Sequence, residues 1–388
     1  MSITSDEGIG AGASLSITHK SDEVGMYRDR ITGRAFVTSR FVQRYELRWD
    51  GLEVGNLPLR LQLAAGLYST AARNYCGLDA NSSCNASDAQ RAAEARGLEN
   101  DEKTLFIDRY YLYRFFLPQA EGIGRWAFLT QPIRLEGYYG WRGGYHLPGD
   151  LFEGYPYPGS RYTEDFPAGE RGSISTLLLG IVADHRDREL LPRRGMYVEA
   201  GMRGGTEAFG SEYEYVAFHA EVAGWAPIDA ASETVFGARW LLDAIEGEVP
   251  VDELARSGGL AHRPAFGGQW LGRGIRSHRF PGRGKFVQQA ELRAFLFDVE
   301  ALGRSVRAYG VGFVDFALVV RDWRFRAPQP GAGGSNNETP LAPRRLLAAA
   351  GAGLRFVVQD SFVLRLEVAV SPEEDTDPLF YAPVGEPF

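Results

Sequence analysis

The chain alternates between apolar and polar residues along much of its length. In residues 361–371 the apolar side chains take one parity and the charged or hydroxyl side chains the other: Phe362, Leu364, Leu366, Val368 and Val370 against Ser361, Arg365, Glu367 and Ser371. Successive side chains of a β-strand point to opposite faces, so the pattern predicts a strand with one apolar face. Segments of about ten such residues are typical of transmembrane β-barrels, whose apolar face meets lipid.

The same alternation predicts fourteen strands in all. From Ile31 to Trp49 it keeps a single parity, which predicts one very long strand. The predicted strands cover residues 8–19, 30–50, 57–73, 103–117, 122–140, 174–187, 196–207, 211–227, 232–246, 286–298, 305–320, 345–358, 361–371 and 379–388. The predicted fold class is therefore all-β: a single transmembrane antiparallel β-barrel that takes up residues 1–388 as one domain.

The connections between the predicted strands alternate between short and long. Residues 50–56, 118–122, 227–230 and 359–360 are short connections, and residues 74–102, 141–173, 247–285 and 321–344 are long ones. Barrels inserted in one orientation have short periplasmic turns and long external loops, which is the arrangement predicted here. Within the first long connection, residues 88–96 have the composition of a short helix.

Composition and charge narrow the class of protein further. No window approaches the roughly 18 consecutive apolar residues of a spanning helix, so membrane crossing has to occur through strands. A net charge of −8 argues against a nucleic-acid partner, which would require a basic surface. Arginines such as Arg60, Arg239 and Arg365 alternate with apolar residues, and we interpret them as lining a polar lumen. A solvated face of a soluble sheet is the alternative.

The sequence contains no arrangement of residues that indicates catalysis. The six histidines lack metal-ligand spacing, so neither a metal nor another cofactor is expected, and we expect the protein not to be an enzyme. The two cysteines, Cys76 and Cys84, lie eight positions apart in a polar segment. That spacing allows a loop disulfide in an oxidising compartment, with two free thiols as the alternative.

The most informative motif lies in the long connection 247–285. Residues 267–282 read GGQWLGRGIRSHRFPG, and residues 287–293 read VQQAELR. This region resembles the most diagnostic part of the BamA/TamA superfamily of outer-membrane proteins, also called the bacterial surface antigen family. The matching residues are Gly267, Gly268, Arg273, Gly274, Arg279, Phe280, Glu291 and Arg293, while Ile275 stands where an aromatic residue is usual.

Further matches to this family follow in the same order along the chain. Residues 180–187 and 192–195 resemble its Asp-x-Arg-Asp and Pro-x-x-Gly turn, with matches at Asp184, Arg186, Asp187 and Gly195. Residues 312–317 resemble Phe-x-Asp-x-Gly, with Ala317 replacing the glycine, and residues 351–356 match Gly-x-Gly-Leu-Arg. The ending at Phe388 is similar to the family's terminal strand.

The resemblance implies sixteen strands and a long extracellular loop that folds back to plug the lumen. In the family the loop arginine meets acidic groups on inward strand faces, so Arg273 is expected to bridge Glu291 and Asp315, which their parity places inward. Gly274 would allow close backbone approach at the loop tip. A solvated Arg273 is the alternative. In either case we interpret this clamp as a stabilising element.

The resemblance also implies a role in inserting or translocating polypeptides at the bacterial outer membrane. The expected partners are outer-membrane lipid and unfolded outer-membrane or secreted polypeptides, and the expected site is a lateral seam between residues 8–19 and 379–388. Family insertases carry POTRA domains before the barrel, and we expect none within these residues. A passive pore or membrane anchor, such as the C-terminal domain of a larger translocator, is the alternative, and a soluble strand-rich binding protein is a third hypothesis.

Overall fold

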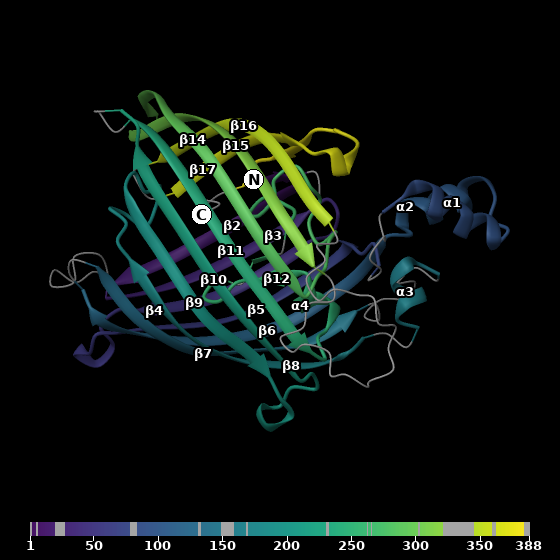
Figure 1. The fold of residues 1–388 in the computed structure, drawn as a ribbon, viewed down its shortest axis with the longest axis horizontal. Helices are drawn as coiled ribbons and strands as arrows, with labels where there is room; N and C mark the ends of the chain where they lie inside the picture. The colour runs from purple at the N-terminus through teal and green to yellow at the C-terminus, as the bar shows by residue number, and fades with distance from the viewer. Residues whose placement is uncertain are drawn as a thin grey trace, which may run out of the picture.

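The fold is a closed antiparallel β-barrel of sixteen strands (Figure 1). It comes from a computed structural model, which describes residues 2–4, 7–19, 28–77, 84–130, 133–148, 159–167, 170–229, 233–261, 263–264, 266–301, 303–320, 345–358 and 362–383. Phe388 lies outside these residues. The predicted fold class is confirmed, with the sixteen strands implied by the family resemblance in place of the fourteen predicted from alternation.

Each barrel strand pairs antiparallel with its neighbours in the chain, and β11 is followed in the sheet by β14. The barrel strands are β1 (Ser2–Thr4), β2 (Gly8–His19), β3 (Asp29–Thr38), β4 (Gln43–Gly51), β5 (Leu59–Asn74), β6 (Leu112–Leu129), β7 (Arg134–Pro148), β8 (Gly172–Asp184), β9 (Gly195–Gly205), β10 (Tyr215–Pro227), β11 (Thr234–Gly247), β14 (Gly284–Ala301), β15 (Arg304–Val320), β16 (Arg345–Val358), β17 (Phe362–Val370) and β18 (Leu379–Tyr381). The barrel closes where β1 pairs with β18.

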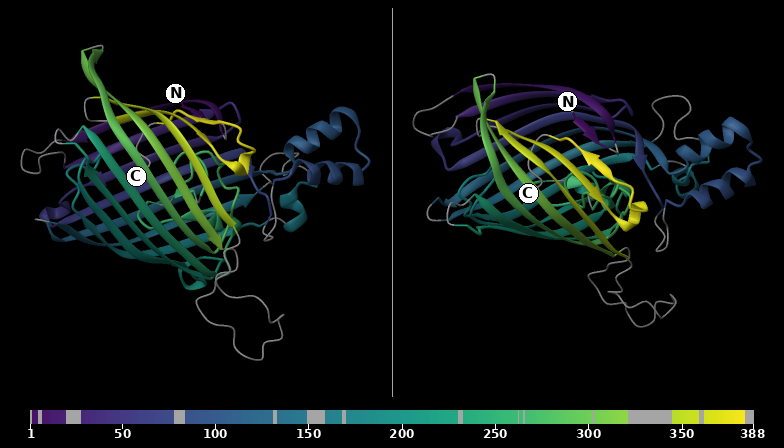
Figure 2. Two further views of the ribbon diagram at one scale, coloured as in Figure 1. Left: turned by 45° about the horizontal axis from the view of Figure 1, so that its top comes forward. Right: turned by 90° about the horizontal axis from the view of Figure 1, so that it is seen from above.

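The remaining elements lie in the connections. They are the helices α1 (Ala86–Ala95), α2 (Asn100–Arg109), α3 (Arg161–Asp165) and α4 (Val251–Leu254), the short ribbon of β12 (Arg256–Ser257) and β13 (Arg263–Pro264), and the 3-10 turns η1 (Val54–Asn56), η2 (Glu207–Phe209) and η3 (Pro372–Glu374). Helices α1 and α2 stand clear of the barrel at the end where α3 lies (Figure 1). The hairpin of β14 and β15 extends past its neighbours at one rim (Figure 2).

The two faces of the wall differ in polarity as the alternation predicts. Along β11, Arg239 and Asp243 are buried, whereas Phe236 and Trp240 are exposed on the other face. The same division recurs around the barrel, so the outer face is apolar and the inner face carries the charged side chains. Within the described residues, no helix is both long and apolar enough to cross a membrane.

The single strand predicted across residues 30–50 is wrong, because this segment is the hairpin of β3 and β4. Its register pairs Ile31 with Trp49 and Ala35 with Tyr45. Odd residues therefore oppose odd residues, and the parity of the apolar positions passes through the turn unchanged. Phe41, which has a φ of 57°, lies in that turn. Alternation alone could not reveal the reversal of the chain.

The strands predicted at 103–117 and 122–140 have wrong boundaries. Residues 112–129 form one strand, β6, so the turn predicted at 118–122 is wrong. The register of β6 against β7 skips from Phe116 to Gln119 around Pro118, which lacks an N–H for the ladder. Residues 100–109 form α2, in which the early Asp101 and late Arg109 complement the helix dipole.

At the two ends of the chain the strands differ from those that the sequence predicts, whereas the helix predicted in the first long connection is present. The short β1 was not predicted, and β18 covers only the first three residues of the predicted terminal strand. The helix predicted at 88–96 corresponds to α1, whose Asn85 side chain accepts a hydrogen bond from the Ser87 amide. A disulfide joins Cys76 to Cys84 at the base of this connection.

Candidate functional site

The connection from β11 to β14 folds against the inner face of the barrel. Four of its apolar side chains are buried against inward-facing residues of β11, β14, β15 and β16. The loop contributes Phe266, Leu271, Ile275 and Phe280, and the strands contribute Leu241, Val287, Ala317, Val319 and Leu347. Ile275, at the position where the family has an aromatic residue, is fully buried here. This cluster holds the loop on one side of the lumen by apolar burial.

Arg273 is the centre of the polar part of this attachment. Its guanidinium donates to both carboxylate oxygens of Asp315, from Nε at 3.1 Å and from the second terminal nitrogen at 3.0 Å, and its backbone N–H donates to the same carboxylate at 2.9 Å. The other terminal nitrogen lies 3.6 Å from Glu291 and 3.5 Å from Glu367. Arg273 is completely buried, so the alternative of a solvated loop arginine does not describe this structure.

The acidic partners of Arg273 belong to a larger buried network. Arg355 of β16 bonds to both oxygens of Glu291, at 2.6 and 2.5 Å, and to Glu367 at 3.2 Å. Arg365 of β17 donates to Glu367 at 3.3 Å and to the Gln269 carbonyl of the loop at 3.0 Å. The sequence interpretation did not include Glu367 or Arg355 in the clamp. Two features of the sequence could have identified them. Both residues have the parity of inward-facing side chains, and Arg355 belongs to the Gly-x-Gly-Leu-Arg motif.

Gly274 brings the loop tip close to the last strands of the barrel. Its φ is 101°, and an added Cβ would lie 3.0 Å from the Val370 carbonyl oxygen and 3.1 Å from the Ala349 Cβ. Its N–H donates to the Tyr381 hydroxyl at 3.0 Å. Both conformation and space therefore favour glycine at this position.

The other motif residues of the loop attach its ends. The N–H of Gly267 donates to the Leu271 carbonyl at 2.5 Å, and that of Gly268 to the Ile275 carbonyl at 2.7 Å, which folds the tip into a tight turn. Arg279 bonds to the Glu373 carbonyl at 2.6 Å and to the Glu374 carboxylate at 2.5 Å, both in η3. The loop is thus tied to the connection between β17 and β18.

The second family motif forms the turn between β8 and β9. Arg186 forms a forked pair with Asp184 at 2.9 and 2.6 Å, and Asp187 accepts from the Arg193 amide at 2.9 Å. Gly195 has a φ of 109°, and an added Cβ would lie 2.1 Å from the His185 carbonyl oxygen. Arg293 of β14 contacts this turn, because its guanidinium donates to the Pro192 carbonyl at 2.5 Å.

A further set of charges anchors the first part of the loop. Asp243 of β11 pairs with Arg203 at 2.7 Å and with Lys285 at 3.2 Å, and accepts from the Gly258 amide at 3.1 Å. Asp252 of α4 pairs with Arg256 at 2.8 Å and with Arg73. Burial alone would raise the pKa of Asp252, but the charges of Arg256 and Arg73 outweigh it and hold that pKa at about 2.

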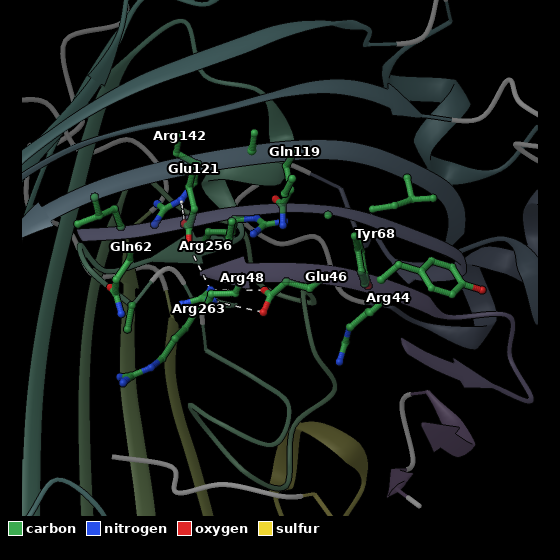
Figure 3. A pocket seen from close by; sticks show the side chains of 18 of the residues that line it. Arg44, Glu46, Arg48, Gln62, Tyr68, Gln119, Glu121, Arg142, Arg256 and Arg263 are labelled. Carbon is green, nitrogen blue, oxygen red and sulfur yellow. Dashed lines mark hydrogen bonds and ion pairs between the residues drawn. The ribbon is translucent and has the colours of Figure 1, made fainter. Parts of the chain in front are cut away.

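A cavity of about 490 Å³ separates the loop from the wall formed by β4 to β7 (Figure 3). Six arginines line it, together with two glutamates: Arg44, Arg48, Arg73, Arg142, Arg256, Arg263, Glu46 and Glu121. The loop therefore contacts the β11 to β17 wall closely and leaves a charged space on the opposite side. In the part of the chain that the structure describes, no three His, Cys, Asp or Glu side chains are placed to hold a metal ion.

The fold and the clamp define a class of protein: a sixteen-stranded membrane β-barrel with a long loop attached to its inner wall. A comparison with protein families matches residues 150–388 to the Omp85 superfamily domain. The match covers more than half of the chain, so the protein belongs to the Omp85 superfamily and is a bacterial outer-membrane β-barrel. The family resemblance and the localisation predicted from the sequence are both confirmed.

Solved structures of similar fold include BamA from Haemophilus ducreyi lacking POTRA domains 1–3, at 14% identity and a TM-score of 0.57. CdiB from Escherichia coli matches at 11% identity and 0.57, and CdiB from Acinetobacter baumannii at 12% and 0.54. Each match covers 99% of this chain, which spans 68%, 61% and 57% of those chains respectively. A comparison with curated proteins finds no match.

Proposed function

We propose that the protein assists the insertion or translocation of polypeptides at the outer membrane, without enzymatic chemistry, through a lateral seam between β1 and β18. Membership of the Omp85 superfamily supports the general role. The proposed substrates are unfolded outer-membrane or secreted polypeptides, and the surrounding partner is outer-membrane lipid. An incoming strand would pair with a barrel edge by β-augmentation.

The observation that carries the seam proposal is the shortness of the pairing between β1 and β18. Among the described residues the register joins these strands at one pair, Thr4 with Tyr381. By contrast, the pairing of β10 with β11 runs without interruption from Tyr215 to Pro227. Backbone hydrogen bonds hold neighbouring strands together, so the junction with the fewest pairs costs the least to separate. The predicted seam used residues 8–19, whereas the first strand of the barrel is β1.

A covalent lock across the junction tests the proposal. The variant Thr4→Cys with Tyr381→Cys, with Cys76 and Cys84 replaced by alanine, is reconstituted into liposomes and oxidised. We expect the reduced form to accelerate the folding of an unfolded β-barrel substrate and the oxidised form to lose that acceleration. The alanine background ensures that the reductant acts on the introduced disulfide alone.

Two controls make the result interpretable. Tyr381→Cys alone, carried through the same oxidation, separates the effect of the lock from the loss of the tyrosine. An equivalent lock between Leu354 and Leu366, which are paired in the register of β16 and β17, should leave the acceleration unchanged. Equal acceleration by the locked and unlocked seam variants would rule out the seam. Ion conductance without any acceleration would favour the alternative role as a passive pore or anchor.

A further inference from the structure

The cavity between the loop and the β4 to β7 wall is lined by positive charge on both sides. The wall contributes Arg44 and Arg48 from β4, Arg73 from β5 and Arg142 from β7. The loop contributes Arg256, which lies near Arg48 and Glu121 of the wall (Figure 3), and Arg263, whose guanidinium extends toward Glu221 of β10. Arginines of the wall and of the loop therefore line the same space in the barrel interior.

The carboxylates around the cavity are already shared between arginines. Glu121 accepts from Arg48 at 3.1 Å and from Arg142 at 3.2 Å, and Arg48 also lies 3.3 Å from Glu46. One terminal nitrogen of Arg142 is buried without a hydrogen-bond partner. Arg48 and Arg142 are thus balanced by Glu46 and Glu121, and Arg44 pairs with Glu7.

On the loop side of the cavity, carboxylates are fewer than arginines. Asp252 is shared by Arg73 and Arg256. Arg263 reaches Glu221 at 3.5 Å, and the same glutamate lies 3.6 Å from Arg239. The six lining arginines therefore pair with five carboxylates, Glu7, Glu46, Glu121, Glu221 and Asp252, which leaves one guanidinium in excess where Arg73 and Arg256 share Asp252.

We propose that this cavity binds a small, soluble, multivalent oxyanion that carries phosphoryl groups. A guanidinium presents paired N–H donors that match two oxygens of a phosphoryl group, and several guanidiniums around one space favour a multivalent ligand over chloride. The volume of about 490 Å³ falls in the usual range of small-molecule sites. The cavity lies on the inner face of the wall, away from the lipid-facing side chains, which selects a soluble ligand over a lipid headgroup. The proposal is independent of the seam.

Calorimetric titration of the folded protein in a non-ionic detergent, with inorganic pyrophosphate as the probe, tests this proposal. We expect saturable binding with one site, weakened by added sodium chloride because the attraction is electrostatic. The double variant R142Q/R263Q should bind at least tenfold more weakly. Arg91→Gln, on the exposed surface of α1, is the matched control and should bind as the wild type does.

A second variant, with an expected gain in affinity for pyrophosphate, distinguishes loss of the site from misfolding of the protein. Glu121→Gln removes the carboxylate that Arg48 and Arg142 share, which frees donors of Arg142 and adds one positive charge to the cavity, so pyrophosphate should bind several-fold more tightly. Loss of structure cannot produce a gain in affinity. The absence of saturable heat with the wild-type protein, or equal affinity in wild type, R142Q/R263Q and Glu121→Gln, would overturn the proposal.

Discussion

The pair of Arg273 and Asp315 gives a quantitative test of the clamp. Both side chains are completely buried, and three hydrogen bonds from residue 273 converge on the Asp315 carboxylate. Arg273→Met would keep much of the side-chain volume but remove the guanidinium. Glu291 and Glu367 would keep Arg355 as a partner, whereas Asp315 would keep only the backbone N–H of residue 273 among the bonds described here.

The expected loss follows from the cost of leaving a charge buried without its partner. Removing one member of a buried ion pair typically costs about 3–5 kcal/mol, and we expect Arg273→Met to lower the free energy of unfolding by that amount. Asp315→Asn should cost less, about 1–3 kcal/mol, because Arg273 keeps Glu291 and Glu367 nearby. The variant with both substitutions has no orphaned carboxylate, so its loss should be smaller than the sum of the single losses.

The measurement is urea unfolding in detergent micelles, followed by tryptophan fluorescence, with the heat needed to abolish the compact band on electrophoresis as a second readout. Arg91→Met, on the exposed face of α1, is the control and should change the free energy of unfolding by less than about 0.5 kcal/mol. A loss below about 1 kcal/mol for Arg273→Met, or strict additivity in the double variant, would refute the interpretation of the clamp as a buried, mutually dependent charge pair.

Three further predictions concern the loops. Gly274→Ala should cost about 1–3 kcal/mol in the same unfolding assay, because its φ of 101° strains alanine and the added Cβ crowds the Val370 carbonyl. Burial and the charge of Asp252 raise the pKa of Glu170 to about 7, and its carboxylate accepts from the Val251 amide. The folded loop thus favours the protonated form, so protection from hydrogen exchange of the Leu254 amide, which donates within α4 to the Pro250 carbonyl, should be greatest below pH 4.5, fall as the pH rises through 7, and become independent of pH in Glu170→Gln. Reducing the Cys76–Cys84 disulfide should speed hydrogen exchange in α1 and leave the heat resistance of the barrel unchanged, since both cysteines lie outside the barrel strands.

The sequence predicted the wall of the barrel better than its turns. Alternation identifies which side chains face lipid, because that choice depends only on parity. It cannot detect a turn that preserves parity, as in the hairpin of β3 and β4. It also misplaced the turn between β6 and β7, because Pro118 and Gly122 are turn-forming residues that occur here within β6. The strand that closes the barrel, β1, is three residues long and is too short to show an alternation of apolar and polar residues.

For the site, the sequence predicted the central residues of the clamp but not its extent. Parity and the family motif together placed Arg273, Glu291 and Asp315 in one region, and the structure brings them together. Glu367 lies 94 residues further along the chain than Arg273, so no local spacing links the two. The cavity was not predicted for the same reason: it depends on where the loop stands away from the wall, which is a property of packing across the barrel.

The attachments of the loop also bear on how a seam between β1 and β18 would open. Tyr381 of β18 accepts the Gly274 N–H, and its ring packs in a buried cluster with Phe313 and Leu379. The next residues continue this attachment, because the Arg365 amide donates to the Pro383 carbonyl at 3.0 Å. Thus β18 is tied to the loop and to β17, whereas its pairing with β1 is one residue long in the described register. If the barrel opens at this junction, β18 stays with the clamped side of the wall, and β1 is the strand whose edge becomes free to pair with a substrate.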